Sequence, residues 1–231
     1  MKGKEIREYL KKEWSLMRSH LDGFLNTRDQ EELHKFRVEI KKIKALLTLS
    51  ENVSRTSFTN AFKPINALFK KAGKVRSDYI KNTLTKKDQH DDKEIRSFCR
   101  LSVKREKHIR CAYRELHSNI RRFSNKKIRR FYKEEMLSVA KKLADRPSAE
   151  QLHECRKRIK VLLYNYALIH NALLFNLNTA YIDSLQEAIG TWHDQYLAGK
   201  ITGDMPLSMN SLAGNFYERA IQHVDQHQVP I

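Results

Sequence analysis

Residues 33–47 read LHKFRVEIKKIKALL, and residues 152–166 read LHECRKRIKVLLYNY. At an offset of 152 − 33 = 119, His34 aligns with His153 and Arg37 with Arg156. Ile40 with Ile159 and Lys41 with Lys160 are further identical pairs. Two copies of one pattern indicate an internal repeat, which decides the fold more strongly than any single segment does.

The segments that follow each copy repeat as well. AGKVRSDYI (72–80) aligns with IGTWHDQYL (189–197) at an offset of 190 − 73 = 117, which places Gly73 on Gly190. The residues that precede the two motifs also correspond, because Asp29 with Glu32 and Ser148 with Gln151 each have the spacing of a capping box. The sequence therefore predicts two copies of one helical unit.

Helical periodicity of the apolar residues covers almost the whole chain. Only 7 glycines and 4 prolines interrupt it, which favours long helices over a sandwich or a barrel. The fold expected is all-α, with eight helices forming two four-helix bundles related by an internal pseudo-twofold duplication. The expected helices span roughly 4–26, 29–51, 57–81, 93–123, 126–144, 149–174, 178–198 and 206–226. Residues 1–231 are expected to form a single domain with half-repeats 1–124 and 125–231, and TLTKKDQHDD (83–92) is interpreted as a linker.

The chain is strongly basic, with 45 Lys and Arg against 27 Asp and Glu and a formal net charge of +18. So large an excess repels itself in the folded state, which favours an anionic partner. The N-terminus is too charged for a signal peptide, and no apolar run reaches the roughly 18 residues of a membrane span. The three cysteines form no CxxC pair, as expected for a reducing compartment. We expect a cytoplasmic protein.

Each motif places cations on one helix face. His34, Arg37, Lys41 and Lys44 are spaced by 3, 4 and 3 residues. Like charges one turn apart weaken an isolated helix, so their repetition indicates a use. Arg donates a fork of hydrogen bonds to phosphate oxygens, and His becomes charged when an anion raises its pKa. The second copy has His153, Arg156 and Lys160, with Lys157 on the adjacent row.

A further basic row runs along the expected fourth helix. Lys104, Lys107 and Arg114 share one face, between Arg100 and Arg121. Two interpretations of this row stay open, namely contact with the ligand and a solvated helix face.

The two His-x-x-Arg motifs with basic residues at +7, each followed by a helix centred on a glycine, resemble the CHAD domain, the conserved histidine α-helical domain. This resemblance implies two four-helix bundles around a basic central cavity that binds inorganic polyphosphate. It also implies a location in the cytoplasm that includes polyphosphate or storage granules. It implicates the following residues in binding: His34, Arg37, Lys41 and Lys44 in the first copy, and His153, Arg156, Lys157, Lys160 and Tyr164 in the second.

The chain departs from the family pattern in both halves. Leu163 stands where the family often has a basic residue, ten after the second histidine, which removes one expected phosphate contact. The Arg-Asp pair usual after the first glycine is loosened to Arg76-Ser77-Asp78, and His193-Asp194 follows Gly190.

Several alternatives are weighed against polyphosphate binding. The two histidines could be structural, and Glu31-x-x-His34 with Glu150-x-x-His153 has the spacing of a di-iron site. Cations beside both motifs argue against that metal site, so no metal and no cofactor are expected. No P-loop or nucleophile elbow is present, which favours a binding module over an enzyme. The same positive charge is compatible with two other functions. The chain could be a nucleic-acid-binding helical protein, or a scaffold that docks an acidic partner or granule.

Overall fold

The computed structural model describes residues 1–85, 92–145, 147–197 and 207–222. The chain divides into two compact units, one formed by Lys2–Arg122 and the other by Met1 with Phe123–Ile231. The boundary lies two residues before the expected junction between the half-repeats.

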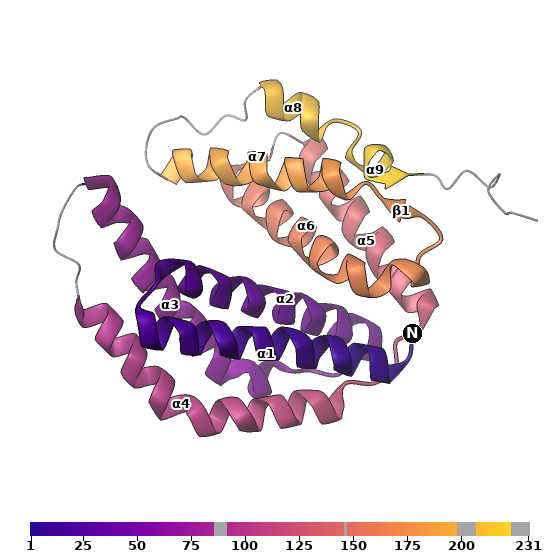
Figure 1. The fold of residues 1–231 in the computed structure, drawn as a ribbon. Helices are drawn as coiled ribbons and strands as arrows, with labels where there is room; N and C mark the ends of the chain where they lie inside the picture. Colours follow the sequence, from indigo (N-terminus) through magenta and orange to yellow (C-terminus); the bar gives the residue numbers. More distant parts are fainter. Residues whose placement is uncertain (86–91, 146, 198–206, 223–231) are drawn as a thin grey trace, which may run out of the picture. The chain divides into compact units, whose positions relative to one another are not determined.

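The first unit consists of four long helices, α1 (Gly3–Thr27), α2 (Gln30–Ser54), α3 (Thr59–Thr85) and α4 (Asp92–Asn119). Helix α1 packs along α2 and α3 along α4, while α2 also contacts α3 (Figure 1). Phe98 of α4 lies edge-on to Phe24 and Phe36, with ring centroids 5.6 and 6.0 Å apart. This aromatic cluster joins α1, α2 and α4 in one core.

One buried ionic cluster lies between α1 and α2. The Lys42 ammonium is 2.9 Å from Glu39 Oε1 and 3.3 Å from Glu13 Oε2. Glu13 and Glu39 are only 3% and 6% exposed. Lys42 therefore belongs to the α1 side of α2, although it is next in sequence to Lys41 of the basic row.

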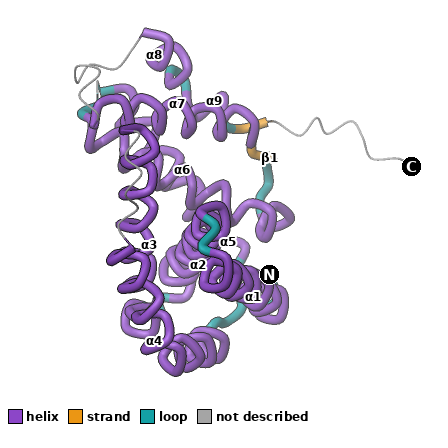
Figure 2. The backbone as a smooth tube through the Cα atoms, turned by 60° about the vertical axis from the view of Figure 1, so that its left-hand side comes forward, coloured by secondary structure: helices purple, strands orange, loops and turns teal. Residues whose placement is uncertain are grey.

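The second unit contains α5 (Asn125–Ala144), α6 (Ala149–Ile169), α7 (Thr179–Leu197), α8 (Leu207–Ala213) and α9 (Phe216–Arg219). Helix α6 packs against both α5 and α7. The buried Tyr132 hydroxyl of α5 donates to Leu162 O of α6 over 2.9 Å. Two short strands, β1 (Asn176–Leu177) and β2 (Ile221–Gln222), pair antiparallel and are the orange segments of Figure 2.

The all-α prediction is confirmed, while the expected helix boundaries are wrong in places. Helix α6 ends at Ile169 instead of 174, because a 3-10 turn at His170–Ala172 leads into strand β1. The expected helix 206–226 is divided within the described residues into α8 and α9. Asn215 between them has a left-handed φ of 51°, which ends α8.

The described ends of the expected linker are helical, and one of the two expected capping boxes is confirmed. Thr83 of the expected linker belongs to α3, and residues 86–91 lie outside the described residues. The capping box of Ser148 and Gln151 forms at the start of α6. Asp29 instead accepts from Glu31 N over 2.9 Å, because Glu32 is bound to His20 Nδ1 at 2.8 Å.

Among the described residues, none of the helices combines the length and apolar character needed to cross a lipid bilayer.

Candidate polyanion-binding surfaces

The first row comprises His34, Arg37, Lys41 and Lys44 of α2, and two of its cations, Arg37 and Lys44, lie against α3. Arg37 Nη1 donates a hydrogen bond of 2.8 Å to Phe69 O. The Phe69 ring also lies under two cations, with its centroid 4.4 Å from Arg37 Cζ and 4.2 Å from Lys44 Nζ. Cation–π contact of this kind holds a positive group without neutralising it.

Gly73 of α3 makes room for Arg37. A Cβ placed on Gly73 would overlap Arg37 Nη1 and would lie 3.3 Å from Arg37 Cζ. The guanidinium therefore lies directly across the glycine, on the turn of α3 whose Phe69 carbonyl it binds. The glycine therefore makes room for an arginine side chain.

The second row comprises His153, Arg156, Lys157 and Lys160 of α6, and it repeats this contact. Arg156 Nε donates to Gln186 O of α7 over 3.0 Å. A Cβ on Gly190 would lie only 2.5 Å from Arg156 Cζ. The accepting carbonyl is four residues before the glycine in each unit, since 73 − 69 = 4 and 190 − 186 = 4. The two units thus hold their motif arginines by the same local arrangement.

The two histidines have different neighbours. His34 is exposed, which argues against a buried structural role for it. Arg76 of α3, anchored by a 3.0 Å hydrogen bond from its Nη1 to Gln30 O, lies near His34. In the second unit His193 stacks on His153 with ring centroids 4.6 Å apart. The buried His153 Nδ1 has no hydrogen-bond partner among the described residues.

Partial burial lowers the pKa of both histidines. The Arg76 guanidinium lowers the pKa of His34 further, and Lys157 and His193 do the same for His153. Each imidazole is therefore mostly neutral at pH 7 and can gain a proton when an anion approaches.

Burial and like charge also lower the pKa of cations in both rows. Burial lowers the pKa of Lys44 most, and the charges of Arg37 and then of Lys70 on α3 lower it further. Burial also lowers the pKa of Arg37 most, followed by the charge of Arg76. Each of these cations makes the charged form of its neighbours less favourable. A bound anion would reverse this effect, which makes the row a candidate anion-binding site.

Lys157 and the predicted residues outside the two rows have different surroundings. Lys157 pairs with Glu154 at 2.6 Å, and Tyr164 is half-buried on α6. Lys104, Lys107 and Arg114 of α4 are exposed and make no hydrogen bond or ion pair with another described residue. Both interpretations of the α4 row therefore stay open.

Lys70, Arg76 and His193 also lie at the two rows, although the motif spacing did not predict them. All three come from α3 or α7, the helices opposite the two motifs. The 117-residue offset between the two glycine-centred helices could have identified Arg76 and His193, because it aligns them with each other.

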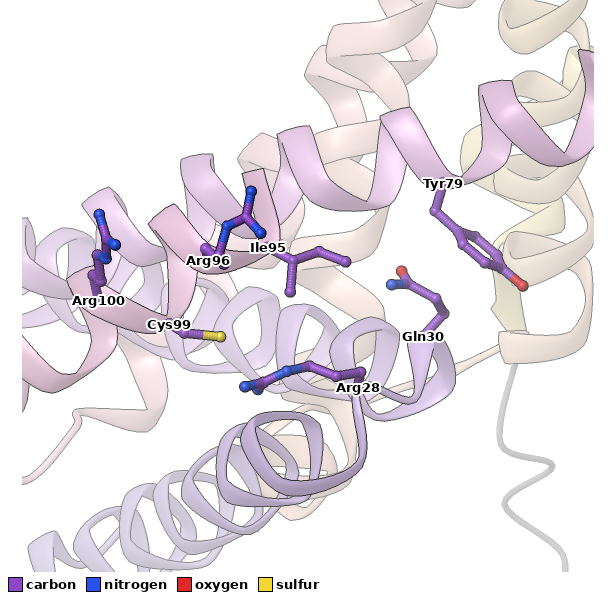
Figure 3. A pocket seen from close by; sticks show the side chains of 7 residues that line it. All are labelled: Arg28, Gln30, Tyr79, Ile95, Arg96, Cys99 and Arg100. Atoms are coloured by element: carbon purple, nitrogen blue, oxygen red, sulfur yellow. The ribbon is translucent and has the colours of Figure 1, made fainter. Parts of the chain in front are cut away.

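A pocket of about 590 Å³ lies at the start of α2, where Gln30 is four residues before His34 of the first row. Figure 3 shows Gln30 pointing into it and Arg28 extending toward Cys99. The pocket is lined by Arg28, Gln30, Tyr79, Ile95, Arg96, Cys99 and Arg100. Its three arginines add to the positive charge at this end of the row. Arg28, however, already donates to the Phe24 and Leu25 carbonyls of its own helix.

The Glu-x-x-His spacing does not build a metal centre in the part of the chain that the structure describes. No group of three or more His, Cys, Asp or Glu side chains there is arranged to hold a metal ion.

Comparisons with known proteins agree with the local geometry. A family model described as the CHAD domain matches residues 8–201, which include both motifs and both glycine-centred helices. Searches of curated proteins and of solved structures found no match. The motif arginines, their glycines and the extent of this match lead to one conclusion. The chain belongs to the CHAD domain family.

Proposed function

We propose that this CHAD domain is a non-catalytic module that binds inorganic polyphosphate along its two basic rows. The observation that carries the proposal is the first row, where Arg37 and Lys44 share the Phe69 ring and no described carboxylate is among the charges that shift the pKa of either cation. From His34 to Lys44 the row spans about 15 Å of helix, at 1.5 Å per residue. A linear chain of phosphates offers one negative charge after another along such a row.

The arrangement of the arginines also suits a phosphate chain. Each guanidinium carries five N–H donors, and the Arg37 and Arg156 hydrogen bonds to backbone carbonyls occupy one of them each. The remaining donors can bind phosphate oxygens while the first bond holds the side chain in place. The expectation that the two rows face one shared cavity stays a prediction.

Competition separates polyphosphate from nucleic acid, because strong salt dependence is expected of both. Labelled single-stranded RNA or duplex DNA is bound first, and long-chain polyphosphate is added at matched total charge. We expect polyphosphate to displace either nucleic acid. Retention of nucleic acid under these conditions would favour the second candidate, a nucleic-acid-binding protein, which the exposed cations of α4 support.

Catalysis is tested on the same preparation. The protein is incubated with polyphosphate and Mg²⁺, and free phosphate is measured over time. We expect no release above the protein-free control, and steady release would contradict a purely binding role.

Polyphosphate affinity should rise as the pH falls through the range near and below 6.5. The pKa of His34 and of His153 is lowered in the free protein, and a bound anion raises both, so binding takes up protons. The gain is about tenfold for each pKa unit that binding adds. Titrations between pH 8 and about pH 5.5 measure it. His34→Gln with His153→Gln should flatten the profile, whereas His170→Gln at an exposed position should not.

Replacing Gly73 by alanine should weaken binding with little effect on stability. The added methyl group displaces the Arg37 guanidinium from Phe69 O, but alanine gains about 1 kcal/mol of helix propensity over glycine. We expect affinity to fall about tenfold, the equivalent of one charge-assisted hydrogen bond. Gly214→Ala is the control, because the nearest atom to a Cβ there is 3.5 Å away. Unchanged affinity in Gly73→Ala would show that the held position of Arg37 is unimportant.

A further inference from the structure

Helices α3 and α7 present the same face to the two rows, so their residues can be compared position by position. Arg37 binds Phe69 O and Arg156 binds Gln186 O, and 186 − 69 = 117 is also the offset between the two glycines. The register from sequence and the register from hydrogen bonds therefore agree. At this offset the pairs are Asn66 with Asp183, Lys70 with Glu187, Arg76 with His193, and Ser77 with Asp194.

In the first unit this face adds positive charge. Lys70 is exposed, lies next to Phe69, and is close enough to Lys44 to affect its ionisation. Arg76 is held over the start of α2 by its bond to Gln30 O, beside His34 and Arg37. Five cations and the titratable His34 thus form one cluster: His34, Arg37, Lys41, Lys44, Lys70 and Arg76.

In the second unit the same face carries carboxylates. Asp183, Glu187 and Asp194 all lie near enough to Lys160 to raise its pKa, which burial and Arg156 lower. Asp183 is placed by a 2.8 Å hydrogen bond from Gln186 Nε2, next to the carbonyl that binds Arg156. In addition, Leu163 occupies the position that corresponds to Lys44, since 163 − 44 = 119.

We propose that the two repeats bind polyanions unequally, with Lys70 and Arg76 as additional binding residues of the first and the α7 carboxylates limiting the affinity of the second. This inference rests on the proposed function and specifies where the binding energy lies. At these four positions the first unit carries two cations and two uncharged residues, whereas the second carries three carboxylates and a histidine. A phosphate chain is attracted by the first set and repelled by the carboxylates of the second.

One matched pair of positions tests the inference directly. Lys70 and Glu187 are equivalent and both exposed, so charge reversal at either one leaves the core intact. The full-length chain carrying Lys70→Glu, and separately Glu187→Lys, is titrated with long-chain polyphosphate at several salt concentrations. We expect Lys70→Glu to weaken binding by about tenfold or more, and Glu187→Lys to tighten it by roughly threefold to tenfold.

Controls with the same change of net charge separate local from general electrostatics. Lys12→Glu on α1 and Glu218→Lys on α9 reverse charges at exposed positions outside both clusters. The slope of log affinity against log salt concentration reports how many counterions binding releases. This number should fall by about one to two for Lys70→Glu and rise by about one to two for Glu187→Lys. The two controls should change affinity by less than about threefold.

The outcomes distinguish this inference from the function on which it rests. If the wild-type chain fails to bind polyphosphate, both fall. If it binds but Lys70→Glu behaves like Lys12→Glu, the unequal division is wrong while the function stands. Equal loss of affinity from Lys70→Glu and Glu187→Lys would likewise overturn the division, because it would show that Glu187 supports binding.

Discussion

Replacing Arg37 and Arg156 together by alanine is expected to weaken polyphosphate binding by roughly two to four orders of magnitude. Each substitution removes charge-assisted hydrogen bonds worth about 1.5–3 kcal/mol, and each 1.4 kcal/mol is about tenfold in affinity. Isothermal titration calorimetry with the full-length chain measures the loss. By the division proposed above, Arg37→Ala alone should account for more of it than Arg156→Ala alone.

The fold should survive this double substitution. Each arginine also donates to a carbonyl of the neighbouring helix, so the free energy of unfolding should fall by about 1 kcal/mol per site. Circular dichroism should show unchanged helicity. Arg130→Ala with Lys12→Ala is the matched control, since it removes two exposed cations from other surfaces. A folded Arg37→Ala, Arg156→Ala protein with wild-type affinity would show that the rows are not the binding site.

Replacing Glu13 by glutamine is expected to stabilise the first unit above pH 7. Burial, and next the neighbouring Glu39 carboxyl, raise the pKa of Glu13 from 4.5 to about 7. The folded chain therefore binds more protons than the unfolded chain between these two values, and stability falls as the pH rises through that window. The loss is on the order of 3 kcal/mol, and a glutamine, which does not titrate, avoids it.

The measurement needs a signal from the first unit alone. Trp14 adjoins Glu13, and the chain's other tryptophan is Trp192, so a Trp192→Phe background makes fluorescence specific for the first unit. Denaturant titrations at pH 5, 6, 7 and 8 give the free energy of unfolding with and without Glu13→Gln. We expect the difference to grow up to about pH 7 and then level off. Parallel profiles would contradict the raised pKa, and Glu8→Gln at an exposed site is the control.

The repeat made most of the fold predictable from the sequence. Long helices with strict apolar periodicity and few breakers, such as α1 and α5, have nearly the predicted bounds. The end of α6 could not be predicted, because it depends on the pairing of Leu177 with Ile221, 44 residues away in the chain (221 − 177 = 44). Helical periodicity reports only on neighbouring residues, whereas this pairing joins residues that are distant in the sequence.

The candidate site was predictable on α2 and α6 and less so on the opposing helices. The 3, 4, 3 spacing placed Arg37, Lys41 and Lys44 on one face without further information. Spacing alone could not separate Lys41, in the row, from Lys42, which pairs with Glu13 on the α1 side. Which helix covers which face is a property of tertiary packing, and for the same reason Lys70 and Arg76 emerged only with the structure.

The most direct test of the account is a crystal structure of the full-length chain with a short polyphosphate. We expect phosphates within hydrogen-bond distance of the Arg37 and Arg156 guanidiniums, with density best ordered along His34, Lys44 and Lys70. Phosphates bound along Lys104 and Arg114 of α4, with Arg37 and Arg156 making no contact to them, would contradict it.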